Sequence, residues 1–171
     1  MCGIFGYTSR DGFTLEPSVL QRMGDEISHR GPDDRGVASD RGWAIGNMRL
    51  SVIDLENGHQ PFVSEDGLVS VVQNGEIFNY IELTHELNAL GIYCKTHSDT
   101  EVILRLYLHF GIEFVSRLNG MFAIAIRDER LKATFLVRDR IGVKPLYLGR
   151  TKNALVFGSE IKTILQSGLF D

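Results

Sequence analysis

Hydrophobic and polar positions alternate along much of this chain, in short runs that predict strands. Each run is rich in apolar and β-branched residues and is bounded by glycine, proline, asparagine or aspartate. Strands are predicted at residues 2–7, on both sides of a turn at 40–42 within 36–47, and at 48–53, 68–73, 121–127, 133–138, 146–149 and 154–158. A further strand-like run covers residues 91–95.

Other segments repeat apolar residues every three or four positions, which predicts helices. Pro17 suits the first position of a helix over 17–28, because its missing N–H would go unused there. Asn79–Glu82 and Ser98–Glu101 each have the spacing of a capping box and predict two further helix starts. The apolar faces of these two helices are Leu83, Leu87 and Leu90, and Val102, Ile103, Leu106, Tyr107 and Phe110. Shorter helical segments are expected at 113–118 and 159–165.

The helices are bunched between groups of hairpin-connected strands, which favours a layered α+β fold over an alternating parallel one. The 171 residues fit one domain, 1–171, that buries a core without disulfides or metals. The net charge of −4 argues against a nucleic-acid-binding surface. No apolar run approaches the length of a membrane span, and no signal peptide is evident. Two cysteines are too few for a disulfide framework, so a cytoplasmic location is predicted and Cys94 is interpreted as structural.

The other cysteine, Cys2, follows the initial methionine directly. Methionine is readily removed before so small a residue, and removal would leave Cys2 with both a thiol and a free α-amine. An α-amine has a pKa of roughly 7.7–8, so it can accept a proton near neutral pH. Nucleophile and general base would then belong to one residue. The alternative is a small buried apolar residue that opens a strand.

Several separated motifs accompany Cys2 in a fixed order. They are His29-Arg30-Gly31-Pro32-Asp33-Asp34, Arg49-Leu50-Ser51-Val52-Ile53, Asn74-Gly75-Glu76-Ile77-Phe78-Asn79, Ser98-Asp99-Thr100-Glu101, Leu118-Asn119-Gly120-Met121-Phe122-Ala123, Arg138-Asp139-Arg140-Ile141-Gly142-Val143-Lys144-Pro145-Leu146-Tyr147 and Phe157-Gly158-Ser159-Glu160-Ile161-Lys162. Together they resemble class II glutamine amidotransferase domains over nearly the whole chain, and most of all the glutaminase domain of asparagine synthetases. The resemblance implies the four-layer αββα sandwich of N-terminal-nucleophile hydrolases, with Cys2 on a central strand.

The resemblance also implies catalytic roles. Cys2 would be the nucleophile and its α-amine the base, while the Asn74 amide and the Gly75 N–H would form an oxyanion hole. From the residues alone, Asn-Gly between β-rich runs favours a two-residue hairpin turn. The two interpretations are compatible, because a tight glycine turn can expose its N–H. Arg30 is expected to support the N-terminal cysteine, and His29 is given no catalytic role.

Substrate contacts follow from the same resemblance. The guanidinium of Arg49 matches an α-carboxylate in a bidentate manner, although an arginine commonly pairs with a surface carboxylate. Asp99 would hold the α-ammonium and Glu76 would add a second acidic contact. The alternatives are a helix-start aspartate and an ordinary exposed strand-end glutamate. The backbone of four consecutive residues is expected to line the pocket: Leu50, Ser51, Val52 and Ile53.

The remaining sequence signals limit cofactors and partners. The histidines lack metal-ligand spacing, so no metal is predicted. Residues 142–145 lack the ending of a phosphate-binding loop and are interpreted as a turn. No Ser-Gly-Gly-Leu-Asp-Ser-like pyrophosphate loop is present, so no cofactor is expected here, and ATP and magnesium would belong to an absent synthetase domain. The chain also ends without an obvious terminating element, as an excised domain would.

The predicted function is hydrolysis of L-glutamine to glutamate and ammonia through a Cys2 thioester. The ammonia would supply an asparagine synthetase-like domain or subunit, with no nucleic-acid or membrane partner. A homodimer is one compatible assembly. Two alternatives stay open: a non-catalytic glutamine-binding module, and a glutaminase domain that serves an acceptor other than aspartate.

Overall fold

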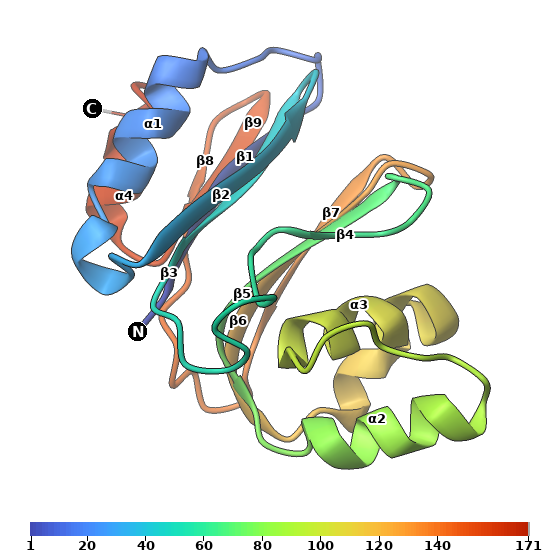
Figure 1. Ribbon diagram of the computed structural model, residues 1–171. Coiled ribbons are helices and arrows are strands. Elements are labelled where there is room, and N and C mark those ends of the chain that lie inside the picture. The colour runs from blue at the N-terminus through green and yellow to red at the C-terminus, as the bar shows by residue number, and fades with distance from the viewer. Residues whose placement is uncertain (171) are drawn as a thin grey trace.

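Two antiparallel sheets stack face to face, with helices on the outer face of each sheet (Figure 1). The structure is a computed structural model that describes residues 1–170. The first sheet contains, in spatial order, β2 (Asp34–Asp40), β3 (Trp43–Arg49), β1 (Gly3–Ser9), β9 (Ala154–Gly158) and β8 (Tyr147–Arg150). The second contains β4 (Phe62–Val63), β5 (Val69–Ile77), β6 (Gly120–Asp128) and β7 (Ala133–Arg138).

The helices complete four layers. Those on the first sheet are α1 (Pro17–Asp25) and α4 (Ile161–Leu165), and those on the second are α2 (Tyr80–Ala89) and α3 (Asp99–Phe110). Two 3₁₀ segments, η1 (Ser28–Arg30) and η2 (Gly111–Arg117), follow α1 and α3. This is the αββα sandwich that the resemblance implied. None of the helices within residues 1–170 is both long enough and apolar enough to span a membrane.

Strand alternation divides the apolar side chains into three buried layers. In β1, Phe5 and Tyr7 pack toward α1, whereas Ile4 faces the space between the sheets. In β5, Val71 packs toward α3, whereas Val72 faces the space between the sheets. Each such fully buried side chain contributes about 1.5–3 kcal/mol.

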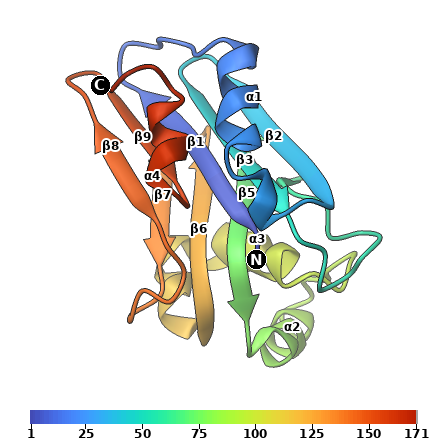
Figure 2. The ribbon, with the colours of Figure 1, turned by 90° about the vertical axis from the view of Figure 1, so that its left-hand side faces the viewer.

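The same alternation determines where the candidate chemistry lies. Cys2 has the parity of Ile4, and Asn74 has the parity of Val72, so both residues belong to the layer between the sheets. Arg49, at the end of β3, has the parity of Ile45, which is in that layer too. Figure 2 shows β1 in the middle of the first sheet, with the N-terminus near β5. Residues far apart in sequence therefore meet at one end of the sandwich.

Two strand predictions are wrong near this end. The predicted hairpin turn at Asn74-Gly75 is absent, because β5 continues to Ile77 and pairs with β6 throughout, with Gly75 opposite Phe122. The predicted strand over 48–53 is also wrong. Its first two residues end β3, and residues 50–53 leave the sheet to form a wall of the site.

Three local predictions are corrected by tertiary contacts. The first helix ends at Asp25 rather than near residue 28. Asn79 occupies the N-cap position of α2, but its side chain makes no capping hydrogen bond and instead bridges Arg117 O, at the end of η2, and Asn119 N, just before β6. Residues 91–95, which contain Cys94, form no strand. By contrast the predicted cap at Ser98 is present, since its hydroxyl accepts the Thr100 N–H at 3.2 Å.

Candidate active site

A small cavity of about 120 Å³ opens at the end of the sandwich where β1, β3 and β5 meet. It is lined by Met1, Cys2, Arg49, Leu50, Val52, Ile53, Gly58, Gln60, Gln73, Asn74, Gly75, Glu76, Ser98, Asp99, Thr100 and Lys144. Nearly all of the predicted site residues are therefore brought together. Ser51 is an exception, because its N–H turns outward to Asp33 Oδ2 at 2.9 Å. Hollows of about 740 Å³ beside α1 and about 730 Å³ at the opposite end of the sandwich are larger but share none of these residues.

Cys2 is held through both its side chain and its backbone. Its Sγ accepts the Leu50 N–H at 3.4 Å and lies 3.6 Å from the Leu50 carbonyl, to which the thiol donates. Arg30 Nε donates to the Cys2 carbonyl at 3.0 Å, and Arg30 Nη1 contacts Glu160 at 3.1 Å. Sequence reasoning anticipated a supporting contact from Arg30.

Glu160 is a supporting residue that the sequence interpretation missed. It lies just after β9 and also contacts His29 Nε2 at 2.9 Å. Partial burial acts to raise the pKa of the Glu160 carboxyl, but hydrogen bonds from Arg30 and His29 outweigh it and lower that pKa. The resulting anion anchors Arg30, and through it the backbone of Cys2. Its partners are 130 residues distant in sequence, so no local pattern could indicate this role.

Asn74 presents an unusual buried amide. Its side chain is fully buried, yet neither Nδ2 nor Oδ1 has a hydrogen-bond partner within residues 1–170. Buried polar groups are normally paired, so such an orphan needs an explanation. A donor reserved for a ligand in the adjoining cavity provides one.

Gly75 adds a second donor at the same place. Phe122, opposite Gly75, uses both its N–H and its carbonyl on Asp139. In an antiparallel ladder the opposed residue then also points its N–H away from the partner strand. The Gly75 N–H therefore faces the free edge of β5 beside the cavity. A side chain is excluded here, because φ is 152° and a Cβ would lie 2.0 Å from the Met121 carbonyl.

Arg49 shapes the wall formed by residues 50–55. The side chain is almost completely buried, and its guanidinium donates to the carbonyls of Ile53 at 3.0 Å, Asp54 at 2.7 Å and Leu55 at 3.4 Å. Gly58 permits this approach, since a Cβ there would lie 2.3 Å from Arg49 Nη2. The guanidinium thus anchors the wall and borders the cavity at once.

Asp99 is a buried carboxyl at the start of α3. Its Oδ2 accepts Gln73 Nε2 at 2.8 Å and the Ile77 N–H at 3.0 Å. Burial raises the pKa of Asp99, and the nearby Glu76 adds to this, although the two hydrogen bonds act in the opposite direction. The position of Asp99 therefore depends on Gln73, which the sequence interpretation did not single out.

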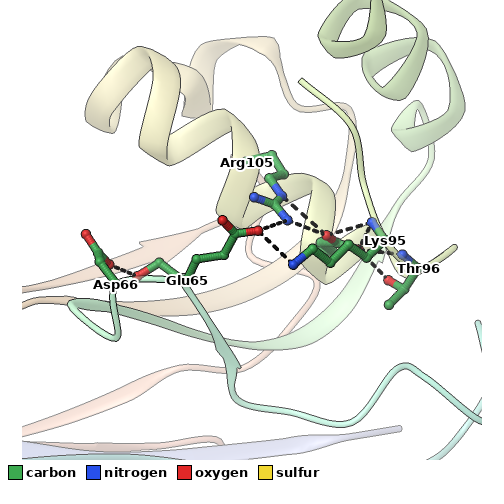
Figure 3. A network of polar contacts seen from close by, with 7 residues as sticks. Glu65, Asp66, Lys95, Thr96 and Arg105 are labelled. Atoms are coloured by element: carbon green, nitrogen blue, oxygen red, sulfur yellow. Dashed lines mark hydrogen bonds and ion pairs between the residues drawn. The ribbon is translucent and has the colours of Figure 1, made fainter. Parts of the chain in front are cut away.

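A second buried carboxyl, that of Glu101, fixes the loop that leads into Asp99. Figure 3 shows the network around it, with Lys95, Thr96 and Arg105 labelled. Glu101 accepts the N–H groups of Lys95 at 2.9 Å and Thr96 at 2.7 Å, and also the Thr96 hydroxyl at 2.7 Å. Arg105 contacts Glu101 at 3.1 Å, and Lys95 pairs with Glu65 at 2.7 Å. Burial opposes ionisation of Glu101, but these hydrogen bonds prevail and lower its pKa. The predicted capping-box role of Glu101 is thus replaced by a clamp on the 95–96 backbone.

The cavity brings several kinds of polar and charged groups together. Among the residues that the structure describes, no group of three or more histidine, cysteine, aspartate or glutamate side chains could hold a metal. The cavity instead combines one thiol, cations, carboxylates and unpartnered N–H donors.

Comparison with known proteins agrees with this chemistry. Residues 1–171 match the glutamine amidotransferase domain family. The chain belongs to this family. Glutamine-hydrolysing asparagine synthetase 2 of Bacillus subtilis is 49% identical over 167 residues, covering 96% of this chain and 22% of that protein. Glutamine-hydrolysing asparagine synthetase 1 of the same organism is 40% identical over 168 residues, which cover 96% of this chain and 27% of that protein.

Further relatives differ in name but share the region. Amidase chry2 of Gibberella zeae is 36% identical over 186 residues, which cover 99% of this chain and 27% of that protein. Among solved structures, glutamine phosphoribosylpyrophosphate amidotransferase of B. subtilis, complexed with ADP and GMP, is 25% identical with a TM-score of 0.82. That match covers 98% of this chain and 44% of the other. This chain spans only about a quarter of the length of these curated relatives.

Proposed function

We propose that the chain is the glutaminase half of a glutamine-dependent amidotransferase and hydrolyses L-glutamine to L-glutamate and ammonia. The observation that carries this proposal is the buried, unpartnered Asn74 amide in the same cavity as the Cys2 thiol. Membership of the glutamine amidotransferase family supports it independently.

The reaction begins once Met1 has been removed. Met1 is 60% exposed, so it is accessible for removal. The freed α-amine takes the Cys2 thiol proton, and Sγ attacks the side-chain carbonyl carbon of glutamine. Negative charge develops on the amide oxygen, where Asn74 Nδ2 and the Gly75 N–H donate to it.

Collapse of this intermediate breaks the carbon–nitrogen bond. The α-ammonium of Cys2 returns its proton to the leaving nitrogen, which departs as ammonia and leaves a glutamyl thioester. Water, deprotonated by the same amine, then attacks the thioester carbonyl and releases glutamate. The thiolate recovers the proton, so the enzyme ends the cycle unchanged.

Substrate recognition uses the charges at the other side of the cavity. Arg49 is assigned to the α-carboxylate, and the wall formed by Leu50, Val52 and Ile53 surrounds the substrate. Asp99 and Glu76 are assigned to the α-ammonium. A cation and two carboxylates held apart in this way select a free amino acid over a peptide-bound glutamine.

The ammonia is proposed to pass to an asparagine synthetase-like domain or subunit. The support is that the B. subtilis relatives are named glutamine-hydrolysing asparagine synthetases. ATP and magnesium would serve that domain and are not required for the steps above. The name of the chry2 relative leaves an acceptor other than aspartate as the second candidate.

The test combines mass and activity. Intact mass should show the loss of Met1, and this protein should release equal amounts of glutamate and ammonia from glutamine. Cys2→Ala should abolish release and prevent formation of a glutamyl adduct, while the matched control Cys94→Ala should retain both. Ammonia release that survives Cys2→Ala would refute the thioester, and a processed wild type that makes no glutamate would refute the glutaminase. Aspartate and other acceptors, each supplied with ATP together with the synthetase domain or subunit, then identify the ammonia acceptor.

A further inference from the structure

Lys144 is a buried cation in the cavity that the proposed reaction does not use. Only 6% of its surface is exposed, and its side chain lines the same cavity as Cys2. Its Nζ contacts Met1 Sδ at 3.5 Å, and none of the ion pairs formed within residues 1–170 near this end involves it. Buried ammonium groups are normally paired, so an unpaired one next to a reactive centre requires a reason.

The loop that carries Lys144 is held rigidly. Asp139 accepts the N–H groups of Val143 at 2.9 Å and Lys144 at 3.1 Å, and also that of Phe122 at 3.2 Å on β6. Arg138 Nε donates to the Lys144 carbonyl at 2.7 Å. Burial opposes ionisation of Asp139, but its backbone hydrogen bonds prevail and lower its pKa. The ammonium is therefore placed by the fold, not by a mobile surface loop.

The Lys144 ammonium reaches into the cavity as far as the Met1 thioether. Lys144 and Cys2 line the same cavity, so removal of Met1 would take away the thioether contact and leave the Lys144 charge sharing this cavity with the new α-amine. A nearby like charge disfavours the protonated form of an amine.

The other charged groups around the amine are already engaged. Arg30 is bound to the Cys2 carbonyl and compensated by Glu160, which also holds His29. On the far wall Arg49 is bound to backbone carbonyls. The two carboxylates that line the cavity, Glu76 and Asp99, are those assigned to the ammonium of glutamine.

We propose that Lys144 is a positioning residue of the glutaminase site, whose buried ammonium keeps the Cys2 α-amine in its free-base form. This inference rests on the proposed function, because it assigns the α-amine as the base. It requires no further reactant: the amine simply remains able to take the thiol proton at neutral pH. An uncharged side chain at position 144 would leave more of the amine protonated and unable to act.

The experiment compares Lys144→Met with Lys144→Arg in the full-length protein, prepared with Cys2 as its verified first residue. The readouts are the pH profile of kcat/KM for glutamine and the ¹⁵N titration of the Cys2 α-amine in protein labelled with ¹⁵N-cysteine. In Lys144→Met the acidic limb and the amine titration should both move to higher pH by about one unit. Lys144→Arg, which keeps the charge, should leave both near the wild-type position.

A matched control is Lys132→Met, at the opposite end of the sandwich, which should change neither readout. An unchanged amine titration in Lys144→Met would overturn the inference, as would an equal shift in the arginine variant. The ¹⁵N titration needs no turnover, so it separates the two hypotheses. If the wild type released no ammonia, the glutaminase proposal would fail, while the titration would still report whether Lys144 acts on the amine.

Discussion

Asn74→Ala provides the sharpest test of the oxyanion assignment, because the structure predicts a large loss of activity with little change in stability. The wild-type amide is fully buried with two unpartnered polar atoms. An unsatisfied buried polar group costs about 1–3 kcal/mol, and alanine removes this cost while losing some packing. We therefore expect the free energy of unfolding to change by less than about 1 kcal/mol, or about 2–4 °C in Tm.

The catalytic effect should be much larger. Loss of one oxyanion donor lowers kcat by about 10²–10³-fold, or about 2.7–4 kcal/mol in the barrier. The assay is steady-state ammonia release with glutamine, alongside thermal and denaturant unfolding of the same preparation. KM should change little, because the donor acts on charge that develops only in the transition state.

Asn47→Ala is the matched control. Asn47 is also buried between the sheets, but its Nδ2 donates to the Gln73 carbonyl at 2.9 Å and it does not line the cavity. This change should cost about 1 kcal/mol of stability and retain most of kcat. A variant at Asn74 that keeps its kcat, or that loses several kcal/mol of stability, would refute the reasoning.

Three further predictions concern the buried carboxyls and the second cysteine. Burial raises the pKa of Asp99 above 3.8, so ionisation of Asp99 lowers the free energy of unfolding as pH rises through that raised pKa. Asp99→Asn should remove this pH dependence in unfolding experiments, and it should raise KM for glutamine by about 10-fold. Glu101 has a lowered pKa, so its carboxylate stabilises the fold above its unfolded pKa of about 4.5, and this contribution is lost as pH falls. Glu101→Gln should lower the free energy of unfolding by about 2 kcal/mol at pH 7, measured by denaturant unfolding. An unchanged denaturation midpoint would contradict the role of Glu101 in holding the 95–96 backbone. Burial raises the pKa of the Cys94 thiol to about 11, so iodoacetamide at pH 8 should alkylate Cys2 first, with activity lost in step, as peptide mapping can show.

Local sequence signals predicted much of the fold correctly. The strands at 133–138 and 154–158 were placed residue for residue, because apolar runs there are bounded by turn residues. The cap at Ser98 was also predicted correctly, because its hydroxyl accepts the N–H of Thr100, only two residues later in the sequence. The order of the four layers followed from the family resemblance instead.

The errors arose where distant strands override local preference. Asn74-Gly75 has the composition of a hairpin turn, but pairing with β6, more than forty positions later in the printed sequence, keeps it extended. Asn79 has the composition of a cap, but Asn119 offers a better partner. Lys144 was interpreted as part of a simple turn, because its burial in the cavity depends on the Asp139 contacts, which no periodicity reveals.

The position of β1 has a consequence for synthesis of the chain. β1 pairs on one side with β3 and on the other with β9, and Ile4 N–H donates to Ser159 Oγ at 2.9 Å. β1 precedes all the other strands of the sheet in the printed sequence, but it has no second neighbour until residues 154–158 have been synthesised. The pairing of β1 with β9 cannot form before that point, so the first sheet beside Cys2 stays incomplete. The strand order therefore couples completion of the first sheet, which carries Cys2 at its edge of the cavity, to synthesis of nearly all of this domain.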